Sequence, residues 1–135
     1  MLEDQIKLQR ETFGIDLERC APEQRMQYIR ENTLALIDEL MEALNETGWK
    51  PWATSNHLDT EAWKSELVDA WHFFMNLMAL GGMTMEDLEE GYYKKRAKNE
   101  QRQREGYDGV TTKCPICKRA YDDDAVYCGP GYCAK

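Results

Sequence analysis

The chain contains no long hydrophobic run. None of its stretches approaches the roughly 18 to 20 apolar residues that a membrane-spanning helix needs, which argues against a transmembrane protein. The first eleven residues, MLEDQIKLQRE, are charged throughout and lack the apolar segment of a secretion signal. We therefore expect a cytoplasmic protein with no membrane partner. In a reducing compartment, five cysteines favour metal ligands or free thiols over disulfides.

Positive charge is also scarce. The sequence has 17 lysines and arginines against 25 aspartates and glutamates, a formal net charge of -8. A protein that coats nucleic acid carries the opposite sign, because the phosphate backbone is negative. Nucleic acid is therefore not an expected partner.

Leucine and methionine are absent after Leu88. Residues 1–107 can therefore build an apolar core, whereas residues 108–135 cannot. This second segment holds four of the five cysteines, and a segment without a core needs another means of stabilisation. The sequence thus predicts a domain over residues 1–107 and a small appendage over residues 108–135.

The first region is predicted to be helical, because its apolar residues recur at three- and four-residue steps and no segment alternates at period two. We expect an all-α fold of the four-helix-bundle type. The first helix is expected to end at Gly14, and the second to begin at Pro22 and end at Gly48 and Pro51. The third is expected to begin at Asp59 or Thr60 and end at Gly81-Gly82. The fourth is expected to begin with a capping box of Thr84 and Asp87.

The second helix has a predicted apolar stripe. Its members are Met26, Ile29, Leu36, Ile37, Leu40, Met41 and Leu44. A helical domain this small, with apolar faces this wide, often completes its core by self-association. We expect a homodimer or a higher homo-oligomer.

Two acidic pairs have helical spacing: Glu39 with Glu42, and Glu66 with Asp69. Residues three apart share a helix face, and facing carboxylates repel unless a cation neutralises them. Mg²⁺ prefers oxygen ligands and keeps positions open for substrate phosphates, so these pairs predict a magnesium site. A solvated acidic face is the plainer alternative. A di-iron centre using Asp69 and His72 would need a second carboxylate–histidine pair, which the sequence does not offer.

A basic stretch follows, at residues 94–104, with six basic residues and one acidic residue. Lys95, Asn99 and Arg102 share one helix face and carry groups suited to phosphate oxygens. The alternative is an exposed basic helix end that complements the helix dipole. Two tryptophans in the loop before the third helix, Trp49 and Trp52, suit either stacking on a base or anchoring of the loop.

Together these motifs resemble the all-α nucleoside triphosphate pyrophosphohydrolases, which include the dimeric dUTPases and the MazG-like enzymes. The matching segments, over roughly residues 5–107, are Glu39-Leu-Met-Glu42, Asn45-Glu46, Trp49-Lys50 with Trp52, Glu66-Leu-Val-Asp69, His72-Phe73, and Lys95, Asn99, Arg102-Gln103 and Gly106-Tyr107.

The resemblance implies Mg²⁺-dependent hydrolysis of a deoxynucleoside triphosphate to the monophosphate and pyrophosphate. It favours dUTP, with dCTP or a broader range as the MazG-like alternative. The roles it implies are metal binding by Glu39, Glu42, Glu66 and Asp69, activation of water by Glu46, and phosphate binding by Lys95, Asn99 and Arg102. It further implies contacts to the nucleoside by Gln9, His72, Trp52 and Phe73, with Trp52 and Phe73 flanking the base.

The C-terminal cysteines, Cys114, Cys117, Cys128 and Cys133, have the spacing C-x₂-C-x₁₀-C-x₄-C. Four thiolates at such spacings suit a closed, structural Zn²⁺ site, so we expect a zinc ribbon. A redox-active or partly disordered tail is the alternative. Cys20 lies far away in the sequence and is expected to be a free thiol. A non-enzymatic helical adaptor whose ribbon docks a partner is the alternative function.

Overall fold

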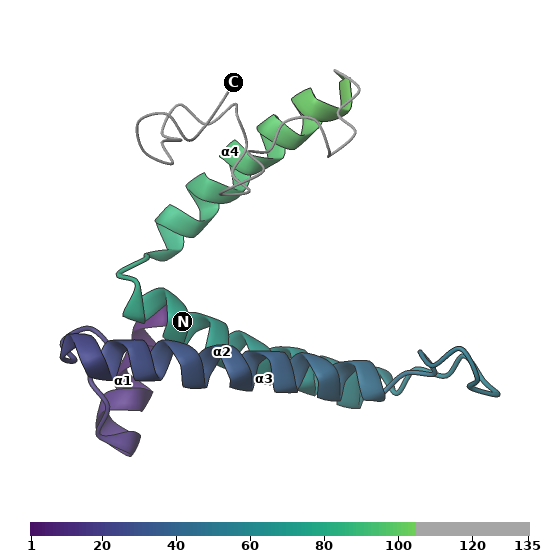
Figure 1. The fold of residues 1–135 in the computed structure, drawn as a ribbon, viewed down its shortest axis with the longest axis horizontal. Helices are drawn as coiled ribbons and strands as arrows, with labels where there is room; N and C mark the ends of the chain where they lie inside the picture. The colour runs from purple at the N-terminus through teal and green to yellow at the C-terminus, as the bar shows by residue number, and fades with distance from the viewer. Residues whose placement is uncertain (105–135) are drawn as a thin grey trace, which may run out of the picture. The chain divides into compact units, whose positions relative to one another are not determined.

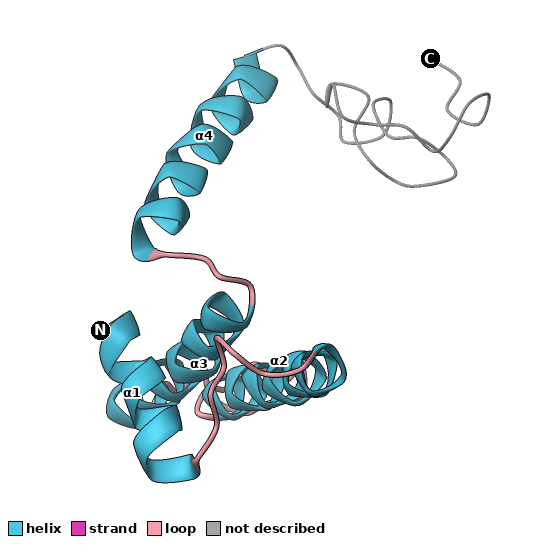
Figure 2. Ribbon diagram, turned by 90° about the vertical axis from the view of Figure 1, so that its left-hand side faces the viewer, coloured by secondary structure: helices cyan, strands magenta, loops and turns pink. Residues whose placement is uncertain are grey.

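The computed structural model describes residues 1–104, which form four helices and contain no strand (Figures 1 and 2). The helices are α1 (Leu2–Phe13), α2 (Pro22–Asn45), α3 (Thr60–Leu80) and α4 (Met85–Arg104). The predicted all-α fold is confirmed. The predicted domain boundary after residue 107 and the four cysteines predicted to bind zinc lie outside the described residues. None of the four helices is long and apolar enough to cross a membrane.

The chain divides into two compact units, Met1–Gly91 and Tyr92–Lys135. In the first, α2 and α3 run side by side in opposite directions, and α1 packs against α3 near one end of this pair (Figures 1 and 2). The small apolar core lies at this end. It contains Leu17, Ala79 and Leu80, which are at most 5% exposed.

The helices begin and end close to the predicted residues. Gly14 terminates α1 in the left-handed conformation (φ 69°), which glycine adopts without steric cost. The side chain of Asp59 accepts a hydrogen bond from the backbone N–H of Ala62 (3.1 Å) at the start of α3. Thr84 and Asp87 form the predicted reciprocal cap, in which each side chain accepts from the other residue's backbone N–H.

The α2–α3 loop, residues 46–59, is held by backbone hydrogen bonds and extends beyond the end of the helix pair (Figure 1). The N–H of Gly48 donates to the carbonyl of His57 (2.9 Å), and the N–H of Asp59 donates to that of Glu46 (2.9 Å). A Cβ atom on Gly48 would collide with the backbone carbonyl of Ser55, so this close approach requires glycine.

The apolar stripe of α2 is not buried within the first unit. Ile37, Leu40 and Met41 are 52%, 47% and 43% exposed, and only Ala43 of this helix is fully buried. The reason is geometric, because α3 covers one side of α2 and the stripe is wider than that contact. The pattern therefore predicted the helix correctly but did not predict which part of the stripe is buried within the first unit.

Candidate functional site

Three of the four predicted metal ligands meet between α2 and α3. Glu39, Glu42 and Glu66 each offer a carboxylate oxygen, and these oxygens all lie within 4.8 Å of one another. Asp69 lies close enough for its charge to act on Glu39. The structure thus brings both predicted acidic pairs together on one face of the helix pair.

The half-buried side chain of Glu39 lies at the centre of this cluster. Its burial, followed by the negative charges of Glu42, Asp69 and Glu66, raises the pKa of Glu39 above its ordinary value. A hydrogen bond between the carboxyl groups of Glu39 and Glu66 acts in the same direction. Such a bond requires a proton, and a bound cation would neutralise the charges instead.

The raised pKa of Glu39 predicts a pH dependence of stability. The folded metal-free protein holds a proton on Glu39 at a pH where the unfolded chain, with an ordinary pKa near 4.5, has released it. The contribution of Glu39 to the free energy of unfolding is therefore greatest below the pKa of the unfolded chain. It is lost as the pH rises through the higher pKa of the folded protein. Relative to wild type, Glu39→Gln should be progressively stabilised from pH 4 to 8, measured by thermal denaturation in a chelator. A constant difference across this range would contradict the prediction.

The cluster fits Mg²⁺ by its donor chemistry. All its donors are carboxylate oxygens, which this hard cation prefers, and their mutual repulsion is relieved by a divalent charge. Glu46, the predicted water-activating residue, caps the C-terminus of α2 and is half-buried. It is not part of the set of mutually close donors formed by the other three glutamates.

A second feature of the first unit is a pocket of about 380 Å³ between α1, α2 and α3. Two predicted nucleoside-binding residues, Gln9 of α1 and Phe73 of α3, line it. The remaining lining residues are Phe13, Ile15, Leu17, Tyr28, Glu31, Asn32, Ala35 and Asn76. The lining is therefore mostly apolar, with three amide groups and the carboxylate of Glu31, which is the usual composition of a small-molecule site.

The pocket and the carboxylates share one face of the helix pair. Asn32 and Asn76 are joined across the two helices by a hydrogen bond of 2.8 Å. Seven residues further along α2 lies Glu39, and seven residues back along the antiparallel α3 lies Asp69. At 1.5 Å per residue, the two features are about 10 Å apart along the helix axes. This spacing suits a nucleoside that places its base in the pocket and its phosphates beside the carboxylates.

The sequence patterns did not indicate Gln5, Asn32 or Asn76 as site residues. Gln5 and Asn76 are 4% and 3% exposed, and their side chains are hydrogen-bonded to each other (2.8 Å). A signal was present, because Asn76 interrupts the most apolar run of the chain, Phe73 to Leu80. A buried amide in such a run needs hydrogen-bonding partners from other elements.

The structure places the other two predicted nucleoside contacts outside the pocket lining. His72 makes a 2.7 Å hydrogen bond through Nδ1 to Oε1 of Gln5. Trp52 is 76% exposed and belongs to the α2–α3 loop. That loop extends beyond the end of the helix pair opposite α1 (Figure 1). Within one protomer, Trp52 and Phe73 are therefore not on opposite sides of one pocket.

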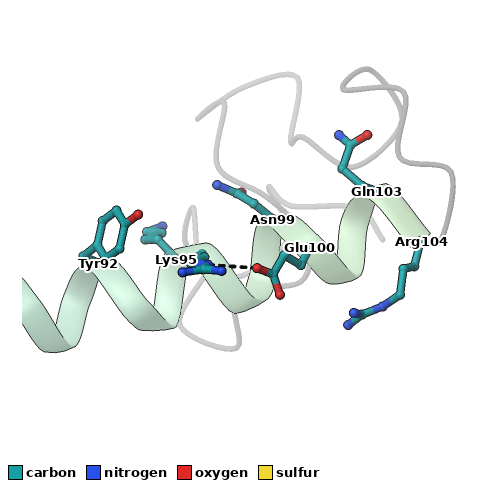
Figure 3. Close-up of a pocket in the computed structure, with 7 residues that line it drawn as sticks. Tyr92, Lys95, Asn99, Glu100, Gln103 and Arg104 are labelled. Atoms are coloured by element: carbon teal, nitrogen blue, oxygen red, sulfur yellow. Dashed lines mark hydrogen bonds and ion pairs between the residues drawn. The ribbon is translucent and has the colours of Figure 1, made fainter.

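The predicted phosphate-binding residues lie in the second unit, on α4. Lys95 and Asn99 line one hollow with Tyr92 and Gln103, and an ion pair between Arg96 Nε and Glu100 Oε1 (2.9 Å) borders it (Figure 3). Arg102 is half-buried on the same helix. The predicted common face thus exists for Lys95 and Asn99.

Comparison with known proteins identifies the family. The sequence pattern of a family described as dUTPase matches residues 1–79, more than half of the chain. The matched segment contains α1, α2 and nearly all of α3, and hence both the carboxylate cluster and the pocket. The chain belongs to this dUTPase family, within the all-α nucleoside triphosphate pyrophosphatases, and the resemblance described above is confirmed.

A relative found among characterised proteins is a dCTP pyrophosphatase of Enterobacteria phage LZ5. It is 37% identical over 71 residues, and the alignment covers 44% of this chain and 41% of the relative. The chain therefore spans about two fifths of the length of that relative. No solved structure matches the chain.

Proposed function

We propose that this protein hydrolyses a deoxynucleoside triphosphate to the monophosphate and pyrophosphate in a Mg²⁺-dependent reaction. The observation that carries the proposal is the placement of an amide-lined apolar pocket and a carboxylate cluster about 10 Å apart on one face of α2 and α3. Membership of the dUTPase family supports it.

In this proposal Glu39, Glu42, Glu66 and Asp69 would hold Mg²⁺, which would supply Lewis-acid polarisation of the phosphates and make the attacking water easier to deprotonate. Glu46 accepts a proton from the attacking water. Lys95 and Arg102 would offset the negative charge that develops on the leaving pyrophosphate, and the amide of Asn99 would donate a hydrogen bond to a phosphate oxygen.

For the nucleoside, we propose that the pocket between α1, α2 and α3 takes a pyrimidine. Phe73 offers a ring for stacking, and Gln9 offers an amide for hydrogen bonding. The family favours dUTP as the substrate. The name of the phage relative favours dCTP as the alternative.

The test is hydrolysis of a panel of the deoxynucleoside triphosphates with Mg²⁺, following pyrophosphate and monophosphate release. We expect a pyrimidine triphosphate to be the best substrate. Preference for a purine would contradict the pyrimidine assignment and leave the reaction class standing. A protein that releases no pyrophosphate from any triphosphate would instead support the helical adaptor.

We also propose that the protein is a homodimer or higher homo-oligomer, built through the exposed apolar face of α2 and α3. A groove of about 300 Å³ runs along this face, lined by Leu36, Leu40, Leu67, Ala70, Trp71 and Phe74. Of these residues Leu40 is exposed, Ala70 is buried and the other four are half-buried. An apolar groove on two neighbouring helices suits the same face of a second copy, because such interfaces are self-complementary.

A charge in this groove should separate the copies. Leu40→Asp places a carboxylate among apolar side chains that the second copy would bury, which is unfavourable without a partner. We expect the variant to elute as a monomer in size-exclusion chromatography with light scattering, while wild type does not. Glu31→Gln, on an exposed part of α2, is the control. A monomeric wild type would refute the proposal.

For the C-terminal cysteines we retain the proposal of one structural Zn²⁺ per chain, held by Cys114, Cys117, Cys128 and Cys133. Elemental analysis of freshly purified, reduced protein should find about one zinc per chain. The double variant Cys114→Ser, Cys117→Ser should lose it, whereas Cys20→Ser, which removes a half-buried free thiol, should keep it. Absence of zinc from wild type would contradict the ribbon.

A further inference from the structure

A chain of four hydrogen bonds made by side chains, the relay, crosses the first unit beside the pocket between α1, α2 and α3. It runs from His72 Nδ1 to Gln5 Oε1 (2.7 Å), from Gln5 Nε2 to Asn76 Oδ1 (2.8 Å), from Asn76 Nδ2 to Asn32 Oδ1 (2.8 Å), and from Asn32 Nδ2 to the backbone carbonyl of Tyr28 (2.8 Å). The relay joins α1, α2 and α3, and its two asparagines line the pocket.

The direction of this relay is determined at one end. A backbone carbonyl only accepts hydrogen bonds, so Asn32 must present its NH₂ group to Tyr28. The oxygen of Asn32 then faces Asn76, which must donate through its NH₂ group. By the same argument, the NH₂ group of Gln5 donates to the oxygen of Asn76, and the oxygen of Gln5 accepts from His72. Nδ1 of His72 must therefore carry a proton. A 180° rotation of any one amide would set two donors or two acceptors against each other.

This locked direction matters for reading a pyrimidine. Uracil has a carbonyl at C4 and an N–H at N3, whereas cytosine has an amino group and a lone pair there. An amide free to rotate exchanges its donor for its acceptor and serves either base. Each asparagine of the relay has one N–H and one oxygen lone pair that the relay does not use and that a ligand can bind. Because the amides cannot rotate, the donor side and the acceptor side of each amide stay in place.

We infer that Gln5 is a positioning residue that sharpens the pocket's discrimination between uracil and cytosine. It donates the second of the two hydrogen bonds that hold the amide of Asn76, the first being the bond from Asn76 to Asn32. The inference rests on the proposed function. Gln5 itself is 4% exposed and is not among the residues that line the pocket, so it acts through Asn76.

The test compares wild type with Gln5→Met, which keeps the length of the side chain but removes both of its hydrogen bonds. Wild type should differ at least about tenfold in kcat/KM between dUTP and dCTP, because a mispaired buried polar group is strongly disfavoured. In Gln5→Met, Asn76 keeps its bond to Asn32 but loses the partner of its Oδ1, so this ratio should fall by about threefold or more, the order of one net neutral hydrogen bond. We expect the loss mainly in KM for the preferred base, with kcat nearly unchanged.

Gln24→Met is the matched control, because Gln24 is exposed at the start of α2, away from the pocket lining, and its side chain accepts a hydrogen bond from the backbone N–H of Ala21 (3.3 Å). Its discrimination ratio should equal that of wild type. If Gln5→Met loses thermal stability but keeps the wild-type ratio, Gln5 is merely structural and the inference is overturned. A wild type that hydrolyses both triphosphates equally well overturns it too.

Nitrogen NMR of His72 provides a readout that needs neither activity nor a folded variant. Wild type should show the Nδ1-protonated tautomer, with His57→Gln used to assign the signals, and the Nε2-protonated tautomer would overturn the relay. Failure to hydrolyse any triphosphate would count against the proposed function alone. The ratio of dissociation constants for dUMP and dCMP, by calorimetry on wild type and Gln5→Met, would then decide the inference, and equal ratios would overturn it.

Discussion

Glu66→Gln is expected to abolish hydrolysis while leaving the protein folded. The substitution keeps the shape of the side chain but removes one negative charge from the cluster whose donor oxygens lie within 4.8 Å of each other. Stabilisation of transition-state charge by a bound metal ion is worth several kcal/mol, and each ~1.4 kcal/mol is a factor of ten in rate. We therefore expect kcat to fall by about 100-fold or more at moderate Mg²⁺.

A stability measurement separates this loss from unfolding. Glu66 raises the pKa of Glu39, so removing its charge relieves repulsion in the metal-free protein. The variant should be at least as stable as wild type in a chelator. Glu61→Gln is the control, because Glu61 lies on the same helix, is 87% exposed and pairs only with Lys64. Near-normal activity of Glu66→Gln at ordinary Mg²⁺ would remove Glu66 from the ligand set.

Leu80→Ala should lower the free energy of unfolding more than any other substitution proposed for this protein. Leu80 is 1% exposed and packs with Leu17 and Ala79 where α1 meets the end of α3. Truncating a buried leucine costs about 2–5 kcal/mol, because it removes apolar contacts and leaves a cavity. In a small domain this lowers the melting temperature by more than about 10 °C, measurable by circular dichroism.

The control for this prediction is Leu34→Ala, which makes the same chemical change on α2 where the side chain is 67% exposed. Its effect should stay within about 0.5 kcal/mol, as for most surface substitutions. Equal losses for the two variants would show that the core at the α1 end does not carry the stability of this unit.

The positions of the helices followed from local sequence. Gly14, Pro22, Asp59 and the pair Thr84 and Asp87 act on the backbone within a few residues of themselves, and their effects do not depend on the rest of the fold. The acidic pairs were equally readable, because a spacing of three residues places both members on one helix face in any helix.

Long-range pairing was not readable in this way. That Asn32 lies opposite Asn76, and Glu39 opposite Glu66 and Asp69, depends on how α2 and α3 align, which no local pattern encodes. The apolar stripe of α2 shows the same limit, because hydrophobic spacing predicts a helix but does not distinguish a face buried in the protomer from an exposed one.

By itself, then, the sequence determined the all-α class, the helix ends, the acidic pairs and the family resemblance, because each depends on local chemistry or on motif order. Only the tertiary structure decided that the two acidic pairs form one cluster and that Gln9 and Phe73 share a pocket. It alone revealed the relay from His72 to Tyr28. Hydrogen bonds between residues up to 71 positions apart require the packed arrangement of three helices, and that packing is a property of the whole unit.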